Sequence, residues 1–273
     1  MRDDWLSKLH ELEMMIAKEI KRICEKNHIR YFLIAGSALG AVRHGGFIPW
    51  DDDMDFGMLR EEYEKFIKAC EKDLDGRFFL QTWDSDPDYP MSYAKIRILG
   101  THFVEEFSEN AKMNNGIFVD IFPYDNVPDS KISRKIQAMR YFVCVRMLWI
   151  KKGMGQNLKN KSIDKRIKYY VFLTLSMPFS YNKVKEYFRR VQQKYNKNRT
   201  DKIVIPFDTY EKIVIKRKWT DQCEYVKFED DEFPLYKNKN EYLTCIIGDY
   251  MKLPPEEKRQ GHLPVQIDFG TYN

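Results

Sequence analysis

Four aspartates lie within five positions of this chain, at Asp51, Asp52, Asp53 and Asp55. Asp51, Asp53 and Asp55 share parity, so on an extended chain their carboxylates point to the same side. Like charges this close repel one another unless a cation holds them together. We therefore expect Asp53 and Asp55 to hold Mg²⁺ or Mn²⁺, with Asp51 as an auxiliary ligand and Asp52 on the opposite side.

A calcium-binding loop is the main competing metal site. Three of the aspartates and Glu62 fall at positions 1, 3, 5 and 12 of an EF-hand loop. The sixth position of that loop needs glycine for a sharp turn, and this chain has Phe56 there. Pro49-Trp50 also stands where the entering helix should be. The sequence therefore argues against an EF-hand.

A further carboxylate, Asp120, lies between Val119 and Ile121 in an apolar run that predicts a strand over residues 116–122. Burying a carboxylate there is costly unless it has a partner. We expect Asp120 to be a third metal ligand, placed to accept a proton from an attacking hydroxyl. The alternative is an aspartate at a strand end that meets water or a lysine.

Positive and backbone groups near these acids predict a phosphate site. Gly36-Ser37 follows an apolar run at 31–35 and predicts a turn into a short helix over 38–43, which Ser37 caps and whose N–H groups bind phosphate. Lys95 and Arg97 share one face of a predicted strand. The expected phosphate-binding side chains are Arg43, His44, Lys95, Arg97 and, from the tail, His262. For each the alternative is an ordinary surface charge, and for His262 a capping or core role.

The elements that must position these groups follow from hydrophobic periodicity. A helix is expected over 3–26 and another over 60–74, and residues 130–196 are expected to be helical in two or three segments. Strands are expected at 31–35, 53–59, 78–83, 93–99, 116–122, 202–205 and 212–216, and a last helix at 240–247.

Composition indicates a globular protein, because 43% of the 273 residues are apolar and 15% aromatic. No apolar run approaches the roughly 20 residues that a spanning helix needs, and residues 1–30 lack a signal-peptide pattern. Five scattered cysteines predict buried thiols in a reducing compartment. We expect a cytoplasmic protein.

Charge is distributed unevenly along the chain. Residues 131–199 contain 19 Lys and Arg but only two acids, Asp164 and Glu186, whereas 27 basic and 39 acidic residues lie elsewhere. This stretch is either the solvated face of a helical subdomain or a peripheral contact for anionic lipid or a lipid-linked glycan. No nucleic-acid motif is present, and the aspartates would repel a phosphate backbone.

Together, the Gly-Ser turn, the Asp-x-Asp strand and the distant strand aspartate resemble the nucleotidyltransferase superfamily. The chain is more closely similar to the LicD family of phosphotransferases. The segments that carry this resemblance are GSALGAVRH at 36–44, FIPWDDDMD at 47–55, YAKIR at 93–97, FVDIFP at 118–123 and GDYMKLPP at 248–255.

The resemblance implies an α/β fold, a nucleotidyltransferase-type mixed sheet core with a helical insertion. The expected parts are a catalytic core at 1–130, a basic helical subdomain at 131–200 and a segment at 201–273 that packs back on the core. It also implies Mg²⁺-dependent transfer of phosphocholine, or a related phospho-alcohol, from CDP-choline or another CDP-alcohol. The acceptor would be a hydroxyl of lipopolysaccharide, teichoic acid or capsule glycan, and CMP would leave.

Two other functions remain open from the sequence. One is a nucleotidyltransferase that adds a nucleoside monophosphate to a small molecule or sugar. The other is a non-catalytic protein that binds anionic lipid or glycan, although such a protein has no need for the three aspartates together. An aromatic cage for choline has candidates in Trp50, Tyr93, Phe122 and Tyr124, none of which the sequence singles out.

Overall fold

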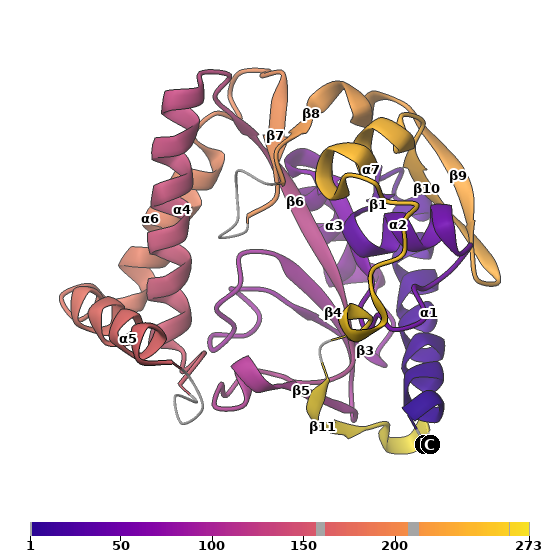
Figure 1. Cartoon of the computed structure of the whole chain (residues 1–273), viewed down its shortest axis with the longest axis horizontal. Coiled ribbons are helices and arrows are strands. Elements are labelled where there is room, and N and C mark those ends of the chain that lie inside the picture. Colours follow the sequence, from indigo (N-terminus) through magenta and orange to yellow (C-terminus); the bar gives the residue numbers. More distant parts are fainter. Residues whose placement is uncertain (1, 157–161, 207–212, 262, 273) are drawn as a thin grey trace.

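A mixed sheet of seven strands lies at the centre of the computed structural model, which describes residues 2–156, 162–206, 213–261 and 263–272 (Figure 1). The strands follow the order β1-β2-β6-β4-β3, β7 pairs with β6, and β8 pairs with β7. Only β2 and β6 run parallel. Their bounds are β1 Phe32–Leu33, β2 Asp55–Leu59, β3 Phe78–Gln81, β4 Ala94–Ile98, β6 Phe118–Val127, β7 Lys202–Val204 and β8 Ile215–Lys216. The expected α/β class with a mixed sheet is confirmed.

β6 is the strand on which the sheet is organised, and all ten of its residues are buried. Its first half pairs with β2 on one side and β4 on the other, and its last three residues pair with β7. Val119 and Ile121 are fully buried on either side of Asp120. The pairing of β2 with β6 therefore places Asp55 and Asp120, which are far apart in the sequence, at neighbouring positions.

Two helices pack against each other and against the central strands: α1 Arg2–Lys26 and α3 Arg60–Asp73. The apolar stripe of α1 is almost completely buried, with Ile16, Ile20 and Ile23 at 0% exposure, as its periodicity predicts. A second pair, α2 Ala35–Arg43 and α7 Lys239–Ile247, also packs together.

The helical segment lies on the side of the molecule opposite α1 (Figure 1). It consists of α4 Lys131–Lys151, α5 Ile163–Ser176 and α6 Tyr181–Gln193. The helices α4 and α6 form a second apolar core around Tyr141 and Phe188, to which the end of β6 and β7 contribute Val127 and Val204. The domain boundaries stated above stay a prediction.

Part of the C-terminal segment folds in a way that periodicity did not indicate. β9 Cys223–Phe228 and β10 Asp231–Tyr236 form a hairpin, and β11 Pro264–Asp268 pairs with β5 His102–Glu105. Short 3-10 helices cover Glu106–Ser108, Arg217–Asp221, Glu256–Lys258 and Gly270–Tyr272.

Some local predictions were wrong. The helix expected over 38–43 begins at Ala35, so Ser37 lies inside its first turn and is not its cap; Ser37 Oγ accepts a hydrogen bond from another segment instead. The strand expected from Asp53 begins at Asp55. Cys223 and Cys245 are exposed free thiols, not buried ones. No helix in the described ranges is long and apolar enough to cross a membrane.

Candidate active site

Three charged side chains occupy matching positions on three neighbouring strands. Asp55 on β2 is the register partner of Asp120 on β6, and Asp120 is the register partner of Lys95 on β4. Side chains at matched positions of adjacent strands project from the same face of a sheet. The sheet therefore lines up two carboxylates and an ammonium group in a row.

Lys95 and Asp120 form a buried ion pair. Lys95 Nζ lies 2.6 Å from Asp120 Oδ1, and neither side chain is more than 8% exposed. Burial raises the pKa of Asp120, and Lys95 opposes this rise. Burial lowers the pKa of Lys95, and Asp120 opposes this fall. The ammonium also stands over the ring of Phe118, 3.3 Å from its centroid, so Lys95 is held between a carboxylate and an aromatic face.

The start of α2 positions the aspartate loop. Ser37 Oγ accepts a 2.7 Å hydrogen bond from the backbone N–H of Asp55, and Ser37 is 5% exposed. A Cβ on Gly36 would stand 2.8 Å from Asp51 Oδ2, so only glycine admits the Asp51 carboxylate at that distance. The Gly-Ser pair thus fixes both ends of the loop that leads into β2.

The carboxylates of this loop converge. Asp55 is half-buried, and its pKa is raised well above the ordinary value by desolvation and then by Asp53, Asp120 and Asp51. Hard oxygen donors that repel one another are the donor set that suits Mg²⁺ or Mn²⁺. Among the described residues, no group of three or more His, Cys, Asp or Glu side chains has the geometry of a preformed metal site. The donor set therefore fits a hard cation in its chemistry, while Lys95 neutralises one of its members.

Glu13 is a further carboxylate that the sequence did not reveal. It lies on α1, is 1% exposed, and its Oε2 has no hydrogen-bond partner among the described residues. Burial raises its pKa well above the usual range, and the four aspartates of the loop raise it further. Its position on an otherwise apolar helix face, at helical spacing from Leu9 and Ile16, was the available signal.

Asp53, Lys95 and Asp120 open into a pocket of about 690 Å³. The wall opposite the sheet comes from α4 and α5, which contribute Arg146, Trp149, Lys165, Lys168, Tyr169 and Phe172. The sequence did not single out these six residues, whose only signal was the basic, aromatic-rich composition of residues 131–199. It gave no signal for Glu105 of β5, which also lines the pocket. Of the four cage candidates, Tyr93 alone lines this pocket.

Other expected phosphate-binding residues are placed elsewhere. Arg97 is 2% exposed and donates hydrogen bonds to Gln81 Oε1 and the Gly116 carbonyl, so it supports the sheet. Arg43 donates to the Tyr250 carbonyl at 2.8 Å and contacts His44, whose pKa burial and Arg43 both lower. Neither Arg43 nor His44 lines the pocket. His262 lies outside the described residues.

Asp52 does not line this pocket. A Cβ on Gly261 would stand 2.4 Å from Asp52 Oδ1, so the Asp52 carboxylate packs against the C-terminal segment. Asp52 is 3% exposed. This placement agrees with its opposite parity to Asp53 and Asp55.

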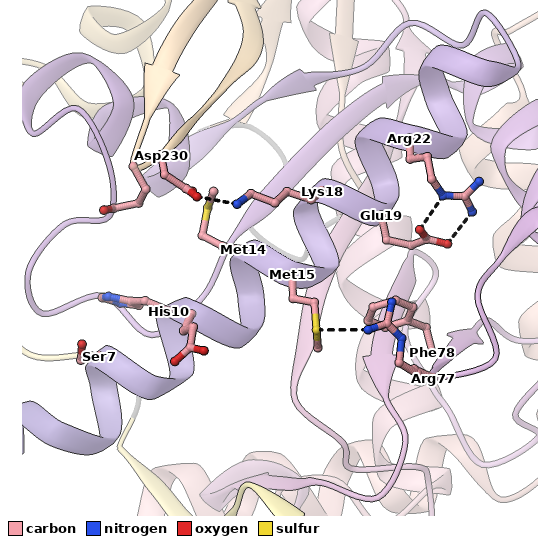
Figure 2. Close-up of a pocket in the computed structure, with 12 residues that line it drawn as sticks. Ser7, His10, Met14, Met15, Lys18, Glu19, Arg22, Arg77, Phe78 and Asp230 are labelled. Atoms are coloured by element: carbon pink, nitrogen blue, oxygen red, sulfur yellow. Dashed lines mark hydrogen bonds and ion pairs between the residues drawn. The ribbon is translucent and has the colours of Figure 1, made fainter. Parts of the chain in front are cut away.

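A second pocket, of about 720 Å³, runs along α1 (Figure 2). Figure 2 shows two ion pairs among its lining residues. Lys18 pairs with Asp230 at 2.6 Å, and Arg22 pairs with Glu19 at 2.7 Å. Among the residues that the structure describes, none of the expected aspartates or phosphate-binding residues lines it. The candidate active site is therefore the pocket that holds Asp53 and Asp120.

Comparison with known proteins agrees with this site. The sequence model described as "LicD/FKTN/FKRP, nucleotidyltransferase domain" matches residues 28–145. Lipopolysaccharide cholinephosphotransferase LicD of Haemophilus influenzae is 30% identical over 252 residues, which are 88% of this chain and 89% of that protein. The chain belongs to the LicD family of phosphotransferases. Ribitol 5-phosphate transferase FKRP of Mus musculus is 31% identical over 116 residues, 40% of this chain and 19% of that protein.

Membership in the LicD family confirms the resemblance drawn from the sequence motifs. The segment that matches the LicD family model contains the aspartate loop, Lys95 and Asp120, whereas α5 lies outside it. The matched part therefore carries the charged row on the sheet, and the pocket wall from α5 is added by the rest of the chain.

Proposed function

We propose that this chain transfers phosphocholine, or a related phospho-alcohol, from a CDP-linked donor to a hydroxyl of a cell-envelope glycan, releasing CMP. The observation that carries the proposal is the row of Asp55, Asp120 and Lys95. Asp120 and Lys95 of this row, together with Asp53, line a pocket large enough for a nucleotide and a sugar. Two relatives support the class of reaction, since one is named for choline phosphate transfer on lipopolysaccharide and the other for ribitol 5-phosphate transfer.

The side chains divide the work of this reaction. Asp53, Asp55 and Asp120, with Asp51 beside them, would hold Mg²⁺ or Mn²⁺, which supplies positive charge to the phosphates. Asp120 accepts the proton of the acceptor hydroxyl while the oxygen of that hydroxyl bonds to the phosphorus that carries the alcohol. The bond between that phosphorus and the CMP oxygen breaks, and CMP leaves with the electron pair. Burial raises the pKa of Asp120, which makes it a stronger base.

Lys95 and the aromatic wall complete the site. Lys95 orients Asp120 through their ion pair, and its ammonium lies where it can meet a phosphate oxygen. Tyr93, Phe118 and Trp149 line the pocket, and with the substrates bound they would limit the access of water, which favours transfer to a sugar over hydrolysis.

The acceptor belongs to lipopolysaccharide, teichoic acid or capsule in this proposal, and the reaction takes place in the cytoplasm. Residues 131–199, with their excess of Lys and Arg, would then lie next to the membrane that carries a lipid-linked acceptor. The main alternative is transfer of the nucleoside monophosphate, which the words "nucleotidyltransferase domain" in the family description favour.

CMP release tests the proposal. The protein is incubated with Mg²⁺, lipopolysaccharide or teichoic acid, and CDP-choline, CDP-ethanolamine, CDP-glycerol or CDP-ribitol in turn. We expect CMP from one or two of these donors, and its loss in Asp53→Asn. A matched control is Asp230→Asn, an aspartate of the second pocket that should keep full activity. No CMP from any donor, or equal CMP from Asp53→Asn, would overturn the proposal.

A further inference from the structure

Helix α5 has two faces with different surroundings. Lys165, Tyr169 and Phe172 lie on the face that lines the catalytic pocket. The opposite face, at helical spacing, carries Ile163 and Ile167, which are 75% and 57% exposed. A helix that forms the wall of the active site therefore presents apolar side chains outward to solvent.

The outward face of α5 makes few packing contacts. Ser176 is the one buried residue of α5. The exposed apolar residues on and directly after this helix are Ile163, Ile167, Tyr170, Val171, Leu175, Met177 and Phe179. Single exposed hydrophobic residues are ordinary, but a contiguous group marks an interaction site. The energy that keeps α5 in place would come largely from whatever covers this face.

The first three turns of α4 also expose apolar side chains. Ile132, Ile136, Met139 and Val143 follow the spacing i, i+4, i+7 and i+11, and each is exposed. α4 and α5 are in contact, with the rings of Phe142 and Phe172 5.6 Å apart. The two helices thus offer two neighbouring apolar stripes.

The charged residues of α4 and α5 indicate which kind of partner the apolar stripes would bind. α4 contains six Lys or Arg residues and no acid. Of the three basic residues of α5, Lys165 and Lys168 line the catalytic pocket, so the cations beside the outward stripes come mainly from α4. Lys135 and Arg140 flank the stripe of α4 and are exposed. A second copy of this chain would bring the same cationic face against itself, which like charges oppose. An anionic bilayer surface satisfies both the apolar stripes and the flanking cations.

We propose that the outward faces of α4 and α5 rest on an anionic lipid bilayer, so that the acceptor is a glycan carried on a lipid in that membrane. The identity of the acceptor in this inference rests on the proposed function, whereas the binding of the helices to the bilayer does not. The helices on the bilayer are also the outer wall of the catalytic pocket.

Vesicle co-sedimentation tests this contact without catalysis. The full chain is mixed with vesicles of phosphatidylcholine alone or of phosphatidylcholine with about one third phosphatidylglycerol. The anionic lipid gives the second kind of vesicle a negative surface potential that attracts basic segments. We expect binding to the anionic vesicles, weakened by high salt. Ile167→Asp/Val171→Asp should bind about tenfold or more weakly, because two apolar anchors are lost and two charges of the wrong sign are added.

The matched control is Ile247→Asp, an exposed isoleucine of α7 on another part of the surface, 44% exposed, which should bind like the unmodified chain. Circular dichroism verifies that each variant is folded. Absence of vesicle binding, equal binding by the α5 variant, or a dimer in solution that Ile167→Asp/Val171→Asp converts to monomer would each overturn the inference. The α5 variant should still release CMP with a soluble glycan fragment; loss of vesicle binding with CMP release intact separates this inference from the proposed function.

Discussion

Lys95 Nζ lies 2.6 Å from Asp120 Oδ1, and both side chains are almost completely buried at the centre of the sheet. The two residues come from antiparallel neighbours, β4 and β6, at directly matched positions. Because Asp55 is matched to Asp120 on the other side, the lysine is at one end of a row of charges that the sheet itself holds in order.

Replacing Lys95 by an uncharged residue should lower both the stability and the activity of the protein. Lys95→Met leaves the buried Asp120 carboxylate without its cation, so we expect a loss of about 3–5 kcal/mol in unfolding free energy and loss of CMP release. Adding Asp120→Asn to Lys95→Met should restore most of the stability, because neither charge of the pair remains, but none of the activity. Urea unfolding measures the first effect. A Lys95→Met protein as stable as the unmodified chain would contradict the importance of the pair.

The affinity for a divalent metal should increase as pH rises. Burial and the neighbouring aspartates raise the pKa of Asp55, so without metal it stays protonated above its ordinary value of 3.8. A divalent cation binds the ionised form and must displace that proton, so its affinity rises with pH. In thermal unfolding after EDTA treatment, we expect added Mg²⁺ to raise the melting temperature more at pH 8 than at pH 5. A Mg²⁺ effect independent of pH would argue against carboxylate ligands.

Glu13 should make the metal-free protein less stable as pH rises. Its folded-state pKa lies well above the ordinary 4.5, so between the two values the folded state binds more protons than the unfolded state. The stability due to protonated Glu13 is complete below pH 4.5 and declines as pH rises through the folded-state pKa, by about 1.4 kcal/mol per unit at most. Glu13→Gln should remove this decline. We expect the variant to match the unmodified chain near pH 4 and to exceed it at pH 8 in EDTA; the reverse order at pH 8 would refute the assignment.

Gly36 should matter for activity more than for stability. A Cβ there would stand 2.8 Å from Asp51 Oδ2, the end of a flexible side chain, so Asp51 can move aside. We expect Gly36→Ala to change the unfolding free energy by less than about 1 kcal/mol, since alanine also favours the helix. CMP release and Mg²⁺ affinity should fall, because Asp51 leaves the cluster. A similar change at Gly76, where a Cβ meets nothing within 4 Å, is the control.

The sequence singled out the members of the charged row because each of them stands out within its own segment. Alternation along strands places Asp55 and Asp120 on defined faces, and the apolar residues around Asp120 marked it as a buried acid with a partner. The alternative in which Asp120 meets a lysine also describes the structure, since Lys95 is that lysine. Which strands become neighbours is a long-range property, so the matching of Lys95 to Asp120 was not visible in either segment alone.

The rest of the site depends on packing between distant segments. Arg97 shares a strand face with Lys95, but its guanidinium bonds to Gln81 and Gly116 inside the sheet. Glu13 and Trp149 come from helices far along the chain from the motifs. Their approach is decided by how whole elements pack, which no periodicity within one segment encodes.

The fate of the donor's two halves tests the central claim most directly. CDP-choline labelled with ¹⁴C in choline and ³H in cytidine is incubated with the protein, Mg²⁺ and an acceptor glycan, and the glycan is then isolated. Our account predicts ¹⁴C on the glycan and ³H in free CMP, with neither transferred by Asp120→Asn. Tritium on the glycan would instead show nucleotidyl transfer and contradict it.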